Sequence, residues 1–178
     1  MYMSESVEVL ISKDEIKNRI TELAEIISKD YEGKKITLVC VLKGGFIFLS
    51  DLCREITVPV ELDFIDVSSY GSSLESSGVI RINKDLENSI TGKDVLLTED
   101  IIDSGNTLNF LVGHIKSKLP ESLRVCAMLD KRGRRAEGSI NADYTGFIIP
   151  NEFVVGYGLD YDQRYRNLPY IGKLIISN

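Results

Sequence analysis

The chain has 178 residues, 43% hydrophobic and 27% charged, which is typical of one globular domain and excludes collagen-like and low-complexity classes. Its 21 basic and 27 acidic residues give a formal charge of −6, which argues against a nucleic-acid binder that depends on phosphate contacts. No apolar run approaches the roughly 20 residues of a membrane-spanning helix, and no secretory signal is present. Three cysteines far apart in the sequence suit a reduced compartment. We therefore expect a cytoplasmic protein without a nucleic-acid or membrane partner.

The first helix is indicated by a capping box, in which Ser12 is followed three residues later by Glu15. Apolar residues then recur at helical spacing. The apolar, β-rich run from Ile36 to Leu42 predicts a strand buried on both faces, which is the pattern of a parallel sheet. Two further elements follow, a helix at Phe46 to Ile56 and a strand at Val60 to Val67.

The next segment, Ser68 to Gly78, is rich in serine and glycine and almost free of apolar residues, which predicts a mobile loop inside the domain. Beyond it we expect strands at Val79 to Asn83 and Asp94 to Asp100, a helix from Leu108 to Leu119, and strands at Leu123 to Leu129, Tyr144 to Ile149, Phe153 to Tyr157 and Ile171 to Ile176. This alternation implies an α/β fold with a parallel, twisted sheet flanked by helices. Ligands of such sheets bind at the carboxyl ends of the strands.

The segment VLLTEDIIDSGNTL, from Val95 to Leu108, carries most of the predicted chemistry. A glycine-containing turn at a helix start presents unpaired N–H groups and the positive end of the helix dipole. With the hydroxyls of Ser104 and Thr107, this turn predicts a cradle for a phosphate monoester. The acids before it, Glu99 and Asp100, suit sugar hydroxyls or a hard divalent cation. The alternative is an acidic strand end, capped by Asp103 or Ser104, that binds no ligand.

The same string resembles the phosphoribosyl-pyrophosphate (PRPP) signature of the phosphoribosyltransferases: two acids, two aliphatic residues, an acid, a small polar residue, glycine, any residue and threonine. Other segments resemble the hypoxanthine-guanine members of that family. VLKGGFIF resembles their pyrophosphate loop, SSYG the start of their lid, LDKRGRR their purine-binding lysine segment, and FVVGYGLDYDQRYRNLPYIG their C-terminal segment. The Ser104 and Asn106 spelling is closest to the bacterial branch that favours hypoxanthine.

The resemblance implies one phosphoribosyltransferase domain over residues 1–178, with a core at about 35–150 and a small hood from about 1–12 and 150–178. It implies transfer of 5-phosphoribosyl from PRPP to N9 of hypoxanthine, and of guanine, in a homo-oligomer, dimer or tetramer, that uses Mg²⁺.

The resemblance also assigns a role to individual residues of this chain. Asp103 is the catalytic group at purine N7. The binding roles are PRPP and its 5-phosphate for Glu99, Asp100, Asp103, Ser104, Gly105, Asn106 and Thr107; pyrophosphate for Lys43, Gly44 and Arg166; the purine for Lys131, Phe153 and Val154; Mg²⁺ for Glu99, Asp100 and Asp160; and a lid containing Ser69 and Tyr70. In the family, the residue that matches Lys43 follows a cis peptide bond.

Plainer interpretations of these residues stay open from the sequence alone. Lys131 could be a surface lysine in a basic run, Phe153 an ordinary core aromatic, and residues 43–45 a simple turn from strand to helix. Asp162 and Arg164 are expected to be a solvated charged stretch. For the whole chain, the alternative is a non-catalytic regulator that senses PRPP or a nucleotide on the same fold.

Overall fold

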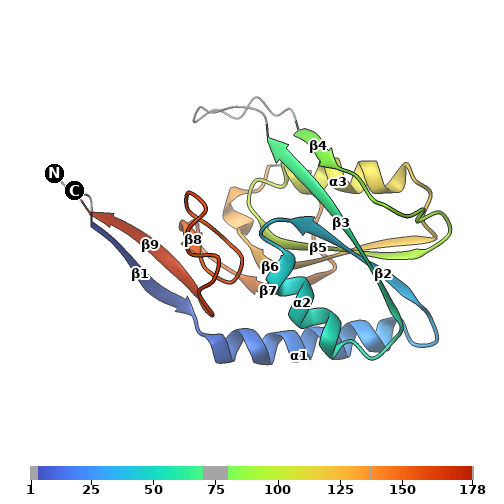
Figure 1. Cartoon of the computed structure of the whole chain (residues 1–178), viewed down its shortest axis with the longest axis horizontal. Coiled ribbons are helices and arrows are strands. Elements are labelled where there is room, and N and C mark those ends of the chain that lie inside the picture. The colour runs from blue at the N-terminus through green and yellow to red at the C-terminus, as the bar shows by residue number, and fades with distance from the viewer. Residues whose placement is uncertain (1–3, 70–79, 137, 178) are drawn as a thin grey trace.

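The computed structural model describes residues 4–69, 80–136 and 138–177. In chain order the elements are β1 (Ser4–Ile11), α1 (Lys13–Asp30), β2 (Ile36–Leu42), α2 (Phe46–Glu55), β3 (Val60–Ser69), β4 (Ile80–Lys84), β5 (Asp94–Ile102), α3 (Asn106–Lys116), β6 (Ser122–Asp130), the 3-10 turn η1 (Arg132–Arg134), β7 (Tyr144–Ile148), β8 (Val154–Val155) and β9 (Ile171–Ser177). In this part of the chain they form a six-stranded sheet and a separate three-stranded sheet (Figure 1).

The larger sheet has the strand order β4-β3-β2-β5-β6-β7. Strands β3, β2, β5, β6 and β7 are parallel, as the sequence predicted, but β4 runs antiparallel to β3 at one edge. Parallel strands need a crossover of a dozen or more residues, and the connection from Tyr70 to Val79 is shorter than that. A pure parallel sheet was therefore the wrong expectation for this edge alone.

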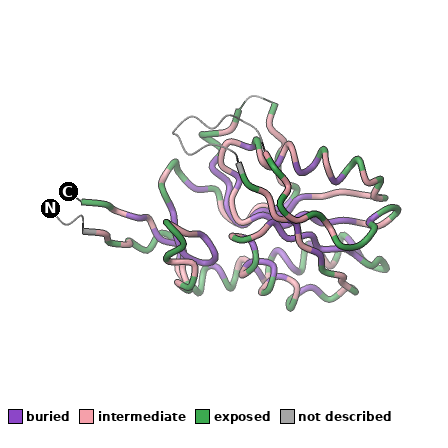
Figure 2. Tube along the Cα trace, turned by 45° about the horizontal axis from the view of Figure 1, so that its top comes forward, coloured by how far each residue is buried: buried purple, intermediate pink, exposed green. Residues whose placement is uncertain are grey.

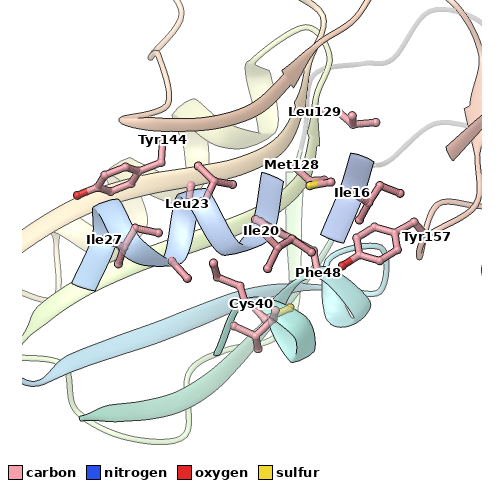
Figure 3. Close-up of a cluster of buried hydrophobic side chains, with 14 of the residues drawn as sticks. Ile16, Ile20, Leu23, Ile27, Cys40, Phe48, Met128, Leu129, Tyr144 and Tyr157 are labelled. Atoms are coloured by element: carbon pink, nitrogen blue, oxygen red, sulfur yellow. The ribbon is translucent and has the colours of Figure 1, made fainter. Parts of the chain in front are cut away.

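Successive residues of the central strands point to opposite faces of the sheet. Leu38 and Cys40 of β2 pack under α1 and α2, in the core shown in Figure 3, whereas Val39 and Val41 pack on the α3 side. The buried part of the trace in Figure 2 follows these central strands. Because both faces are covered, β2, β5 and β6 are mostly apolar in their middle, and most of their charged groups lie toward the ends of the strands.

The first helix is confirmed with its capping box. The Ser12 backbone N–H donates to Glu15 Oε2 at 2.8 Å, and the Glu15 N–H donates to Ser12 Oγ at 3.3 Å. The third helix is shorter than predicted, because it ends at Lys116. Leu119 instead has a φ of 57°, is 70% exposed, and accepts a hydrogen bond from the Gly92 N–H. Its place in the helical pattern was therefore coincidental.

The smaller sheet joins the two ends of the chain, in the order β1-β9-β8. Strand β1 pairs antiparallel with β9, from Ser4 opposite Ser177 to Ile11 opposite Ile171. Figure 1 shows the two strands as an arm that extends from the body, with the start of β1 and the end of β9 at its tip. The Arg164 side chain is half exposed, as predicted for a solvated residue, and it also pairs with Glu5 of β1 at 2.8 Å.

Among the described residues, no helix is both long enough and apolar enough to cross a membrane.

Candidate active site

Two adjacent carboxylates lie near the carboxyl end of β5. The strand continues through them to Ile102, two residues beyond its predicted end. Glu99 is only 7% exposed, and its Oε2 has no hydrogen-bond partner. Burial raises the pKa of the Glu99 carboxyl well above its usual range, and the charge of Asp100 raises it further. A buried, unpartnered carboxylate oxygen is the kind of group that a bound cation or hydroxyl would satisfy.

The glycine that follows β2 comes close to these acids. A Cβ atom at Gly44 would lie 1.5 Å from Asp100 Oδ2, so a larger residue here would displace the Asp100 side chain. The peptide bond between Leu42 and Lys43 is cis, as the family resemblance implied. Because β2 and β5 are parallel neighbours, the carboxyl ends of both strands lie at the same edge of the sheet. The candidate pyrophosphate loop and the two acids are thereby brought together.

The loop after β5 leads into α3 and forms the glycine-containing turn at the helix start that the sequence predicted. Gly105 is the N-cap of the helix, with a φ of 85° that favours glycine over other residues. A cavity of about 240 Å³ lies here, lined by Glu99, Asp100, Ile101, Ile102, Asp103, Ser104, Gly105, Thr107 and Leu108. Of the predicted 5-phosphate residues, only Asn106 does not line it; its backbone N–H instead lies 3.4 Å from Ser104 Oγ.

The candidate purine-binding lysine follows β6, the next strand of the sheet. Lys131 is 6% exposed, so the alternative of a surface lysine is wrong. Its Nζ lies 3.2 Å from Asp103 Oδ2, so the structure joins the residue predicted to contact the purine C6 carbonyl and the residue predicted to contact N7. The Nε of Arg134 lies 2.9 Å from the other oxygen, Asp103 Oδ1. Sequence reasoning assigned nothing to Arg134, because a run of four basic residues does not show which of them faces the site.

The C-terminal segment supplies the remaining candidates. Phe153 is 54% exposed and meets Tyr161 edge to face, with ring centroids 5.7 Å apart, so the alternative of a core aromatic is wrong. Val154, by contrast, is buried. Arg166 donates to the Gly158 carbonyl at 2.8 Å and pairs with Asp160, also at 2.8 Å.

Gly158 connects this segment to the pyrophosphate loop. A Cβ atom on Gly158, whose φ is 99°, would lie 2.1 Å from the carbonyl oxygen of Gly44. The arginine predicted for pyrophosphate is therefore held, through Gly158, beside the loop that was predicted for the same ligand.

Two parts of the predicted site, the lid and the metal ligands, are not seen assembled among the described residues. Ser69 is the last residue of β3, so the predicted loop starts later than Ser68, and Tyr70 lies outside the described residues. Within the described ranges, no three His, Cys, Asp or Glu side chains come together as a metal site. Asp160 was predicted for a second ion, bound through water, so it is not expected to join Glu99 and Asp100 in one cluster, and its role stays a prediction.

A larger cavity, of about 430 Å³, lies elsewhere in the molecule. It is lined by Ile16 and Ile20 of α1, Asp51 and Arg54 of α2, and the 167–169 segment, among others. None of the predicted site residues lines it, so size alone would have selected a different place on the protein.

Comparison with known proteins agrees with the family resemblance. The phosphoribosyl transferase domain matches residues 11–162. Over 176 residues the chain is 50% identical to the hypoxanthine phosphoribosyltransferase of Salmonella typhimurium and 51% identical to that of Escherichia coli, with 98% of each protein covered. A hypoxanthine-guanine phosphoribosyltransferase structure from Bacillus anthracis is similar with a TM-score of 0.89 and 43% identity, over 97% of this chain and 99% of that chain.

Proposed function

Since the chain belongs to the phosphoribosyl transferase domain family, we propose that it transfers 5-phosphoribosyl from PRPP to N9 of hypoxanthine, and of guanine, and releases pyrophosphate. The observation that carries this proposal is the cavity at the end of β5, where Glu99, Asp100 and a glycine-capped helix start meet Asp103, which pairs with Lys131. An anionic sugar phosphate and a neutral base could be held there next to each other. Holding both reactants can remove roughly 7–11 kcal/mol of the barrier.

The 5-phosphate would bind at the start of α3. The backbone N–H groups around Gly105 and the hydroxyls of Ser104 and Thr107 are its donors, and the helix dipole favours its charge. Glu99 and Asp100 would accept hydrogen bonds from the ribose hydroxyls, which gives the unpartnered oxygen of Glu99 a partner. These contacts fix C1 of the ribose relative to the base.

The pyrophosphate and its cation would lie between two loops. Lys43, the backbone at Gly44, and Arg166 are the groups for pyrophosphate, and the Gly158 contact holds the two loops together. Glu99 and Asp100 offer oxygen ligands that suit Mg²⁺, and Asp160 is proposed for a second ion through water. Bound there, Mg²⁺ would neutralise the charge that develops on the departing pyrophosphate.

The base would bind on the opposite side of C1. Lys131 donates to the carbonyl at purine C6, which disfavours adenine because adenine carries a donor amine there. Asp103 accepts the proton of N7 while N9 bonds to C1 and the C1–oxygen bond to pyrophosphate breaks. Proton transfer of this kind is typically worth ~10²–10⁴ in rate. Phe153 would stack on the purine ring, beside Val154 at the base edge.

The remaining parts of the proposal rest on the sequence and the family. They are a cytoplasmic location, a homo-oligomeric state, the 1–178 domain with its hood, and a lid at Ser69 and Tyr70. A regulator that only senses PRPP or a nucleotide is the alternative, and the relatives reported above give it no support.

An initial-rate panel tests the proposal. Hypoxanthine, guanine, xanthine, adenine and orotate are each supplied with PRPP and Mg²⁺, and nucleotide and pyrophosphate are measured. We expect hypoxanthine to give inosine monophosphate at the highest rate, and EDTA to stop the reaction. Adenine or orotate as the best acceptor would contradict the role of Lys131, and PRPP binding without turnover of any base would favour the regulator.

A further inference from the structure

The carboxylate of Asp103 has a different cation at each oxygen. Oδ2 lies 3.2 Å from Lys131 Nζ, and Oδ1 lies 2.9 Å from Arg134 Nε. The side chain of Lys131 is 8% exposed, whereas those of Asp103 and Arg134 are 43% and 50% exposed. The proposed function uses Asp103 and Lys131 but leaves Arg134 without a role.

Binding of a 6-oxopurine would separate one of these two pairs. In the proposed reaction Lys131 turns to the purine carbonyl and Asp103 Oδ2 turns to the N7 proton, so both lose their mutual contact. A carboxylate left with no second partner would be free to rotate. The ion pair between Arg134 Nε and Oδ1 opposes this rotation while Oδ2 changes partner; in the free protein it is a charge contact at 2.9 Å without the geometry of a hydrogen bond.

Arg134 is itself well anchored for such a role. Its backbone N–H donates to the Lys131 carbonyl at 2.9 Å, which closes the turn η1. The same turn is held by an ion pair between Arg135 and the buried Asp130, with an N···O distance of 2.7 Å. The Nη1 of Arg134 also lies 3.5 Å from Asn151 Oδ1, on the segment that leads to the candidate stacking residue.

We propose that Arg134 is a positioning residue of the transfer reaction: it holds Asp103 Oδ1 so that Oδ2 meets the purine N7 proton once Lys131 has turned to the base. The inference rests on the proposed function. The N7 proton passes to Oδ2, N9 bonds to C1, and pyrophosphate leaves with the electron pair of the broken bond. Arg134 exchanges no proton and touches no substrate atom in this step.

The first test replaces Arg134 in the full chain and measures kcat and KM with hypoxanthine and PRPP. Because the effect is one of orientation, Arg134→Ala is expected to lower kcat about 10-fold, with the KM for PRPP within about twofold of the wild type. Arg134→Lys keeps the charge without the guanidinium fork and is expected to recover part of kcat. An unchanged kcat in both variants would overturn the inference.

Arg132→Ala is the matched control. Arg132 lies in the same turn, and its replacement removes the same charge. Its Nε lies 3.4 Å from Asp130 Oδ2, however, and not against Asp103. It is expected to keep the wild-type kcat. An equal fall in kcat for Arg132→Ala and Arg134→Ala would show a general effect of charge or of the turn, and would overturn the specific role of Arg134.

A double-mutant cycle separates positioning from any independent structural effect. If Arg134 acts through Asp103, adding Arg134→Ala to Asp103→Asn should lower kcat by less than about twofold, although the single variant loses about 10-fold. A full further 10-fold loss in that background would overturn the inference. A wild-type protein without transfer activity would refute the proposed function and the inference together, whereas an active wild type with a normal Arg134→Ala overturns the inference alone.

Discussion

The two ends of the candidate site, the anion end proposed for PRPP and the base end proposed for the purine, differ in how tightly their residues are packed. At the anion end, Glu99 is 7% exposed on a central strand, and the Gly44 backbone lies directly against Asp100. At the base end, Phe153 is 54% exposed, and Asp103 is held by side chains that can exchange partners. The anion end is therefore fixed by the packed sheet before substrate arrives, whereas the base end is adjustable. A substitution at the anion end should affect the reaction with every base, whereas a substitution at the base end should leave the binding of PRPP unchanged.

The largest expected effect is at the anion end, from Gly44→Ala. The new Cβ would lie 1.5 Å from Asp100 Oδ2, so Asp100 has to leave its position. We expect kcat/KM to fall about 10²-fold or more, by the same factor for hypoxanthine and guanine, because reactant placement is lost for both. Initial rates with the two bases measure this. Gly113→Ala is the control, since no atom lies within 4 Å of its added Cβ.

At the base end, Asp103→Asn should lower kcat about 10²-fold because it removes proton transfer, with little change in PRPP binding. Single-turnover rates are the proper measurement, since slow product release can conceal the chemical step. Asp85→Asn removes a comparable charge from an exposed pair with Lys118 and should leave turnover unchanged. A folded Asp103→Asn protein with wild-type single-turnover rates would remove Asp103 from the chemistry.

A smaller and more selective effect is expected at Phe153. Loss of an aromatic stack of about 0.5–1.5 kcal/mol predicts that Phe153→Ala raises the KM for hypoxanthine about 3- to 10-fold. The KM for PRPP should stay unchanged, which is the selectivity expected of the base end. Leu119→Ala, which removes an even more exposed apolar side chain, is the control. Equal increases in both KM values for Phe153→Ala would contradict the division of the site.

The smallest effect concerns stability rather than turnover. Because burial raises the pKa of Glu99, the folded protein binds this proton more tightly than the unfolded chain does. The contribution of this protonated carboxyl to the free energy of unfolding is therefore fully present below the ordinary pKa of 4.5, and it is lost as the pH rises through the higher pKa of the folded state. Without PRPP and in EDTA, Glu99→Gln should be more stable than the wild type at pH 8 by on the order of 1 kcal/mol.

Urea unfolding at pH 8 and pH 4 measures the prediction for Glu99. The advantage of Glu99→Gln should vanish at the lower pH, where the wild-type carboxyl is protonated in both states. The variant should be inactive at either pH. A wild type that is more stable than the variant at pH 8 would contradict this prediction, and would show that the Glu99 carboxylate has a stabilising partner in the free protein.

The elements of the fold that the sequence predicted well are those specified by local patterns. The Ser12–Glu15 capping box and the apolar strand from Ile36 to Leu42 each follow from neighbours along the chain, and both are confirmed. The end of α3 was wrong because Leu119 continues the helical spacing while its backbone turns to meet Gly92, a contact between distant segments. The antiparallel direction of β4 likewise depends on the length of a connection and not on a residue pattern.

The site was predicted as a set of residues and not as a set of contacts. The motif around Asp103 and its glycine turn is local, and the structure places it at one cavity. The burial of Lys131 and its pairing with Asp103 arise because β5 and β6 are neighbours in the sheet, which no spacing along the chain reveals. For the same reason, Arg134 could not be distinguished from the two other arginines of its segment.

The pairing of Ser4 with Ser177 makes the arm the contact of longest range in the described chain. Closing a loop of that length costs about 2–3 kcal/mol more entropy than closing a loop of ten residues. The arm should therefore form late in folding, after the main sheet has brought its two strands close. Because the arm holds the start of β1 beside the end of β9, a short peptide that connects the two would replace this long-range closure with a local hairpin. The chain could then be opened at an exposed turn such as that of Gly92.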